Sequence, residues 1–167
     1  MSGLVFLSNN KKTRVNPLNS SQKIFISKNS IIDFNARSKK HALQEASNIA
    51  EREYNLNSKK CVEILIEREK LGSTGLGNGI AIPHGKYVEL DVIYAIFLRL
   101  NNPINFESVD GMPVDLIFVL LAPMNKGSDH LKVLSQITRY FGTKEVRKNI
   151  RGADNVDAVA AILMEVL

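Results

Sequence analysis

His84 has the surroundings best suited to chemistry in this 167-residue chain. Pro83 keeps the residue before it extended, and Gly85 places no side chain beside the imidazole, so the ring is accessible. An accessible imidazole is a nucleophile near neutral pH and can accept a phosphoryl group directly. A histidine before a glycine can also be a turn residue bonded to the backbone. On this evidence His84 is a candidate phosphoryl acceptor.

Groups that could stabilise a transferred phosphoryl group lie on both sides of His84 in the sequence. Phosphoryl transfer develops charge on three equatorial oxygens, so an acceptor site needs cations or N–H donors. Arg68 can form a bidentate pair with such oxygens, and His130 falls in the first turn of an expected helix, which favours an anion. A glycine-rich segment adds backbone N–H groups and hydroxyls. Its candidate phosphoryl-binding residues are Ser73, Thr74, Gly75, Gly77 and Asn78.

The glycine-rich segment GSTGLGNGIAIPHGK, residues 72–86, fits neither of two familiar nucleotide-binding motifs. A P-loop has four residues between its first glycine and the GK pair, whereas five separate Gly79 from Gly85, and Tyr87 stands where a Ser or Thr is needed. The dinucleotide fingerprint needs a glycine where Ile80 stands. The spacing therefore disfavours nucleotide binding.

Two continuous apolar runs, residues 92–100 and 114–122, predict the centre of a β-sheet. Runs without alternation are typical of strands that are covered on both faces. Between them, Asp110 and Gly111 predict the turn of a small hairpin over residues 106–114. Shorter β-prone pieces lie at residues 24–26, 31–34 and 80–83.

Helical spacing of apolar residues predicts helices before and after this sheet. Ser38 and Ser128 are expected N-caps, while Gly72 and Gly142 are expected ends. The helix that follows Ser128 should bury Leu131, Leu134, Ile137 and Phe141. The expected helices lie after residue 38 and at about 58–72, 128–142, 144–151 and 155–166. This pattern predicts an α/β (α+β) fold with a mixed β-sheet flanked by helices.

The excess positive charge lies at the start of the chain. The whole sequence has 22 basic and 17 acidic residues, a net charge of +5, and five of the basic residues precede the first acidic residue, Asp33. We predict that residues 1–22 form a disordered basic arm and that residues 23–167 form a single domain. The arm lacks the interleaved aromatic residues of a nucleic-acid binder, so no nucleic-acid partner is expected, although weak contact with an acidic surface stays open.

Other classes of protein are disfavoured by what the sequence lacks. The single cysteine, Cys61, forms no internal disulfide and occupies a core position of a helix, and three scattered histidines give no metal-ligand spacing. The apolar runs are shorter than the ~18 residues that a membrane-spanning helix needs, and the first is too short for a signal peptide. We therefore expect a cytoplasmic protein without metal and without membrane insertion.

The stretch REKLGSTGLGNGIAIPHGK, residues 68–86, resembles the signature of a known family. It is similar to enzyme IIA of the bacterial phosphoenolpyruvate-dependent phosphotransferase system, in the nitrogen-regulatory branch of the fructose/mannitol superfamily. The likeness extends from about residue 24 to the C-terminus and includes PVDLIFVLLAP, residues 113–123, and DHLKVLSQI, residues 129–137.

The resemblance implies a role for each candidate at the centre of the site. His84 would accept a phosphoryl group through Nε2 from an HPr-like carrier protein, Arg68 would neutralise the group, and His130 would hydrogen-bond it. No cofactor would be needed. The implied fold is the mixed sheet of the mannitol/fructose-like enzymes IIA, and the implied function is a phosphotransferase component that signals to regulatory target proteins through its phosphorylation state.

Several alternatives stay open at this stage. The chain could be a sugar-specific, fructose-type or mannitol-type enzyme IIA that passes phosphate to an enzyme IIB, or a non-catalytic anion-binding or docking module. Arg68 could instead pair with Glu67 or Glu69, and His130 could be a solvated helix-start residue. Ser73 and Thr74 could only shape the loop. His41, flanked by lysines, is expected on a solvated helix face.

Overall fold

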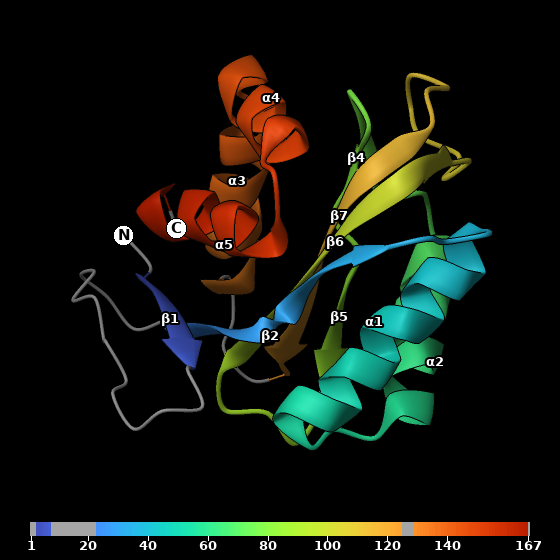
Figure 1. Ribbon diagram of the computed structural model, residues 1–167. Helices are drawn as coiled ribbons and strands as arrows, with labels where there is room; N and C mark the ends of the chain where they lie inside the picture. Colours follow the sequence, from blue (N-terminus) through green and yellow to red (C-terminus); the bar gives the residue numbers. More distant parts are fainter. Residues whose placement is uncertain (1–2, 8–22, 125–128, 167) are drawn as a thin grey trace.

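The computed structural model describes residues 3–7, 23–124 and 129–166, which form three layers (Figure 1). A mixed sheet lies in the middle, with α1 and α2 on one face and α3, α4 and α5 on the other. The described strands are β1 (Gly3–Leu7), β2 (Lys23–Phe34), β3 (Gly75–Gly77), β4 (Ile80–Ala81), β5 (His84–Tyr87), β6 (Ile93–Ile104) and β7 (Val114–Pro123). The described helices are α1 (Lys39–Tyr54), α2 (Ser58–Lys70), α3 (Asp129–Gly142), α4 (Lys144–Gly152) and α5 (Val156–Val166).

The sheet places His84 beside the most buried strand of the fold. Its order is β1-β2-β6-β7-β4-β3, and β5 pairs with β7 next to β4. Strands β6 and β7 are antiparallel; β7 is almost wholly buried and residues 93–100 of β6 are mostly buried, as their continuous apolar sequences predict, while residues 101–103 of β6 are exposed. Strands β4 and β5 run parallel to β7, and His84 lies in register with Leu120.

Each face of the sheet has its own hydrophobic core. On the α1 and α2 side the fully buried side chains include Leu43, Leu65 and Cys61, so the prediction of a core position for the cysteine is confirmed. On the other side Phe97, Phe118 and Phe141 pack ring against ring, with centroids 5.6–6.1 Å apart. The predicted mixed sheet flanked by helices is confirmed. Among the described residues, no helix is long and apolar enough to cross a membrane.

The structure differs from expectation within residues 1–22. Gly3–Leu7 form strand β1, which runs parallel to β2 with Leu4 opposite Ile24 and Leu7 opposite Ser27. The sequence LVFL is rich in residues that favour strands, and β2 would otherwise leave one edge unpaired. The prediction of a disordered arm was therefore wrong for these five residues, and residues 8–22 lie outside the described part.

The small hairpin predicted over residues 106–114 is not formed. The turn exists, with Gly111 at φ 70° and its N–H donating to Ser108 O at 2.9 Å, but Val114 pairs with Ile104 of β6, and residues 106–113 contain no strand. They form the loop between β6 and β7, because Phe106 is buried in the core and Asp110 bonds the backbone of Asn78 instead.

The buried face of α3 differs from the one predicted, which contained Leu131, Leu134, Ile137 and Phe141. Leu131 is 56% exposed, whereas Val133 is buried together with Ile137 and Phe141. Leu134 is only partly buried and lines a cavity. The predicted cap, Ser128, lies outside the described residues. As a result, Leu131 lies at the surface, in the same helical turn as His130.

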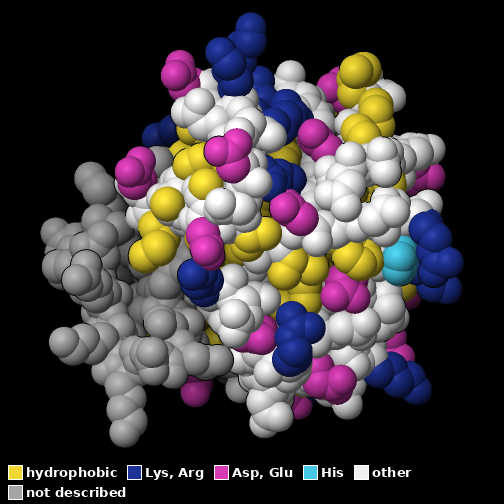
Figure 2. Space-filling model, in the orientation of Figure 1, with side chains coloured by type: hydrophobic (Ala, Val, Ile, Leu, Met, Phe, Trp, Pro, Cys, Tyr) yellow, Lys and Arg dark blue, Asp and Glu magenta, His cyan; other side chains and the backbone are white. Residues whose placement is uncertain are grey.

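Charged side chains of both signs are intermixed over the face shown in Figure 2, and hydrophobic side chains form small separate patches there. Elsewhere among the described residues, opposite charges also pair, for example Arg99 with Asp33 at 2.6 Å and Arg151 with Asp115 at 2.7 Å. The face in Figure 2 therefore offers no continuous basic surface of the kind that a nucleic-acid backbone requires.

Candidate active site

The backbone around His84 fixes the orientation of its ring. Pro83 O accepts the N–H of Leu120 at 3.0 Å, which ties the start of β5 to β7. The imidazole Nδ1 lies 2.8 Å from Ile82 O, and because a carbonyl oxygen only accepts, Nδ1 carries the hydrogen in this contact. The lone pair of the ring is thereby on Nε2. In this tautomer Nε2 is the ring nitrogen that can act as a nucleophile.

The environment of His84 favours the neutral imidazole. Burial is the main cause that lowers its pKa below the ordinary value of 6.5, and electrostatic interactions with Arg68 and His130 lower it further. The hydrogen bond to Ile82 O acts in the opposite direction but does not outweigh burial. At neutral pH the ring is therefore uncharged, which is the nucleophilic form.

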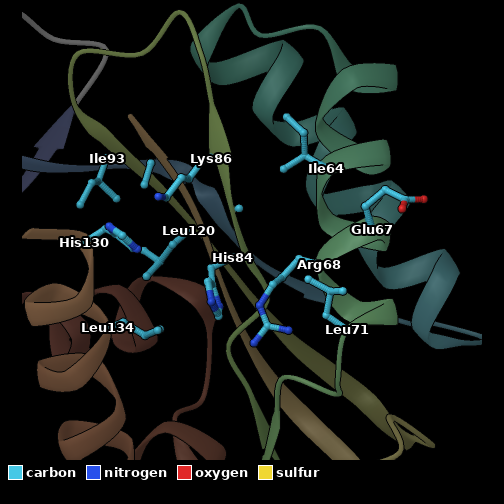
Figure 3. Close-up of a pocket in the computed structure, with 12 residues that line it drawn as sticks. Ile64, Glu67, Arg68, Leu71, His84, Lys86, Ile93, Leu120, His130 and Leu134 are labelled. Carbon is cyan, nitrogen blue, oxygen red and sulfur yellow. The ribbon is translucent and has the colours of Figure 1, made fainter. Parts of the chain in front are cut away.

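Five elements, α2, β5, β6, β7 and α3, contribute residues to the cavity next to this ring. Its volume is about 440 Å³, and Arg68 from α2 and His130 from α3 approach His84 from opposite sides (Figure 3). Arg68 is partly buried and its Nη1 donates to Gly72 O at 2.9 Å. The three residues that the sequence placed at the centre of the site are thus brought together.

The walls of the cavity are mostly apolar. Its hydrophobic lining residues are Ile64, Leu71, Ile93, Leu120, Ala122 and Leu134. Such walls lower the local dielectric and strengthen the attraction between an anion and nearby donors. Glu67 also lines the cavity, and its carboxylate accepts from Lys70 Nζ at 2.6 Å. The cavity therefore suits an anionic group whose charge is balanced by a few nearby cationic side chains.

Five predicted phosphoryl-binding residues are not among the residues that line this cavity: Ser73, Thr74, Gly75, Gly77 and Asn78. Their polar groups are used inside the fold, since the Ser73 hydroxyl donates to Phe106 O at 2.7 Å and the Asn78 N–H donates to Asp110 Oδ2 at 2.9 Å. The geometry therefore gives them a part in shaping the loop and no contact with the cavity. His41 also lies elsewhere, with its ring against Phe34.

Lys86 is a member of the site that the sequence analysis passed over. It lines the cavity, is exposed, and its side chain makes no hydrogen bond or ion pair among the described residues. Residues two apart on a strand share a face, so His84 and Lys86 of β5 belong to the same side of the sheet. That periodicity was the signal in the sequence that could have identified Lys86.

Gly85, between them, faces α2. A Cβ at this position would overlap Ile64 Cγ2, so only glycine lets α2 pack closely on β5. We expect Gly85→Ala to lower the free energy of unfolding by about 2 kcal/mol, measured by urea denaturation, because the helix must move or the side chains must strain.

Two further variants test this contact. Gly142→Ala is the matched control, since a Cβ there meets no atom within 4 Å. In an Ile64→Ala background, most of the destabilisation caused by Gly85→Ala should disappear. Equal losses in both backgrounds would show that this clash is not the cause.

Comparison with known proteins places the whole domain in one family. The family model for the phosphoenolpyruvate-dependent sugar phosphotransferase system, EIIA 2, matches residues 23–166. The protein belongs to this EIIA 2 family. The resemblance seen in the sequence around His84 is confirmed by this match.

Individual relatives agree with this assignment. The chain is 46% identical over 126 residues to a nitrogen regulatory protein of Bradyrhizobium diazoefficiens, covering 75% of this chain and 82% of the relative. The crystal structure of nitrogen regulatory protein IIA-Ntr from Neisseria meningitidis superposes with a TM-score of 0.78 at 40% identity, over 83% and 95% of the two chains. IIA mannitol from Escherichia coli gives 0.67 at 25% identity, over 81% and 96%. The similarity to the nitrogen-regulatory branch is thus confirmed.

Proposed function

We propose that this EIIA 2 protein is a phosphohistidine carrier and regulator. In this proposal His84 accepts a phosphoryl group from an HPr-like carrier protein, and regulatory target proteins respond to its phosphorylation state. The observation that carries the proposal is the hydrogen bond between His84 Nδ1 and Ile82 O, which leaves Nε2 as the nucleophile beside Arg68 and His130.

The transfer needs no cofactor and no net proton movement. Nε2 of neutral His84 attacks the phosphorus of the phosphohistidine on the carrier, and a new N–P bond forms while the old one breaks. The electron pair of the old bond leaves with the carrier's imidazole, and the proton of His84 stays on Nδ1, which continues to donate to Ile82 O. The loose transition state passes between Arg68 and His130, where charge on its equatorial oxygens is stabilised. The ammonium of Lys86, which lines the same cavity, adds attraction for the incoming group.

Regulation follows from the change in charge. A phosphoryl group adds about −2 charge to the site, while the chain from residue 34 on is close to neutral. A partner that docks over the cavity therefore meets a different surface in the two states. The two most similar proteins described above are named nitrogen regulatory proteins, which supports a regulatory role here.

The direct test incubates the protein with phosphoenolpyruvate, enzyme I and the HPr-like carrier, followed by intact mass spectrometry. We expect a gain of one phosphoryl group, about 80 Da, that is lost in mild acid and kept in base, as a phosphoramidate should be. No gain from a demonstrably phosphorylated carrier would favour the anion-binding or docking module instead.

The rate of acceptance should show a characteristic pH dependence. Because the pKa of His84 lies below 6.5, the rate should fall in acid as the ring becomes protonated, and the midpoint of this fall should lie below pH 6.5. The free energy of unfolding should also decrease as the pH falls through this range, because His84 binds a proton more readily in the unfolded chain than in the folded protein. Single-turnover rates and an NMR titration of the ring check both statements; an inflection above pH 6.5 would contradict them.

A sugar-specific role is the second candidate, because the matching family model describes a sugar phosphotransferase system and IIA mannitol shares the fold. The acceptor chemistry would be the same, and the difference lies in the recipient. Transfer from the labelled protein to a fructose-type or mannitol-type enzyme IIB, followed by loss of the 80 Da adduct, would establish that role.

A further inference from the structure

Arg68 and His84 lie on different elements, and the contacts that hold the two meet at one residue, Thr74. Its N–H and hydroxyl donate to the two carboxylate oxygens of Glu69, at 2.9 and 2.6 Å. Its carbonyl accepts the N–H of Ile82 at 3.0 Å. Thr74 therefore bonds to the end of α2 on one side and to the strand leading to His84 on the other.

On the α2 side, these bonds close a turn that holds Arg68. The N–H of Gly72 donates to Glu69 O at 3.2 Å, and Thr74 holds the carboxylate of the same glutamate. Hydrogen bonds before and after the Gly72 carbonyl, from Gly72 N and from Thr74 N to Glu69, therefore fix the position of this carbonyl. It is this carbonyl that accepts Arg68 Nη1 at 2.9 Å.

On the strand side, the connection reaches the nucleophile in two steps. Ile82 donates its N–H to Thr74 O, and its own carbonyl accepts from Nδ1 of His84 at 2.8 Å. Both hydrogen bonds involve the same residue, so a displacement of Thr74 shifts the carbonyl that orients the imidazole.

The connection is buried and partly ionic. Thr74 is 4% exposed and the Glu69 side chain 6%, and Lys39 Nζ lies 3.2 Å from Glu69 Oε1. Hydrogen bonds to a carboxylate are stronger than those between neutral groups, and water hardly competes at this depth. The arrangement therefore resists distortion more than a surface loop would.

We propose that Thr74 is a positioning residue that sets the distance between the Arg68 guanidinium and His84 Nε2 through Glu69 and Ile82. This inference rests on the proposed phosphoryl transfer, and it gives Thr74 no contact with the phosphoryl group. A misplacement of a catalytic group by about 1 Å is enough to slow a reaction strongly.

The test compares Thr74→Val, which keeps the shape but removes the hydroxyl, with Thr74→Ser, which keeps the hydroxyl. We expect kcat for phosphoryl acceptance to fall roughly tenfold in Thr74→Val with little change in KM for the carrier, and to stay within about twofold of wild type in Thr74→Ser. In an Arg68→Gln background Thr74→Val should have almost no further effect, because the substitution removes only the hydroxyl bond to Glu69, keeps the backbone bond to Ile82, and the guanidinium positioned through Glu69 is gone. An equal loss in both backgrounds would overturn the proposal.

A measurement without the carrier separates this inference from the proposed function. Arg68 lowers the pKa of His84, so a loosened Arg68 should raise it, and an NMR titration should place Thr74→Val between wild type and Arg68→Gln. An unchanged pKa would overturn the positioning role even if wild type accepts phosphate, and a wild type that accepts none would overturn the proposed function alone.

A second variant covers the case in which Thr74→Val fails to fold. Glu69→Gln keeps an acceptor for the Thr74 N–H but removes the charge. It should also lower kcat, and only where Arg68 is present. If its effect were independent of Arg68, the proposal would be overturned.

Discussion

The His84→Gln protein should gain no phosphoryl group under conditions in which wild type is fully labelled. A carboxamide is not a nucleophile toward phosphorus, so acceptance should fall by at least about 10³-fold. The glutamine amide can still donate a hydrogen bond near Ile82 O, and the position is only partly buried, so the fold should survive. Intact mass after exposure to the phosphorylated carrier measures the first statement, and circular dichroism the second.

His41→Gln is the matched control for this experiment. His41 is also partly buried and also uses Nδ1 in a backbone contact, accepting from Arg37 N at 3.1 Å, but it does not line the cavity. That variant should be labelled like wild type. Acid-labile labelling of His84→Gln would show that another residue is the acceptor, and His130 would be examined next because it shares the cavity.

Arg68→Gln should lower the rate of acceptance by about 10²-fold, which is about 2.7 kcal/mol of transition-state stabilisation. The guanidinium lies at an apolar cavity, where its charge is weakly screened, and no other group on α2 replaces it because Glu67 is an anion. Arg68→Lys should recover only part of the rate, since an ammonium lacks the planar pair of donors. Single-turnover kinetics with excess phosphorylated carrier measure these rates.

Arg52→Gln serves as the control for Arg68. Arg52 lies in the last turn of α1, is exposed, and pairs with Glu53 at 3.2 Å, away from the cavity. Its loss should leave the rate unchanged. A rate within about twofold of wild type for Arg68→Gln would mean that the guanidinium does not meet the transferred group.

The layers of the fold were predictable because their signals are local. Strands β6 and β7 are encoded by continuous apolar runs, and the start of α1 by Ser38, whose hydroxyl accepts the His41 N–H at 3.1 Å. Both patterns depend on residues a few positions apart. By contrast, β1 is a short strand that depends on pairing with β2, and β-propensity alone does not reveal such a partner.

The site was predictable in part for the same reason. The composition of the glycine-rich segment shows that many N–H groups are available but not where they point. The partner of Asn78 N is Asp110, 32 residues later, and that of the Ser73 hydroxyl is Phe106, 33 residues later. Because of these long-range contacts, donors that could bind an anion instead stabilise the loop. No periodicity in the sequence encodes such contacts.

The contact between His84 Nδ1 and Ile82 O has an evolutionary consequence. In many enzymes a second side chain, often a carboxylate, orients the catalytic histidine, and one substitution can remove it. Here the orienting group is a main-chain carbonyl, which every amino acid possesses. Position 82 can therefore vary, as far as the hydrophobic core allows, without loss of the preferred tautomer. The tautomer of His84 is thereby protected from mutation at the residue that orients the ring.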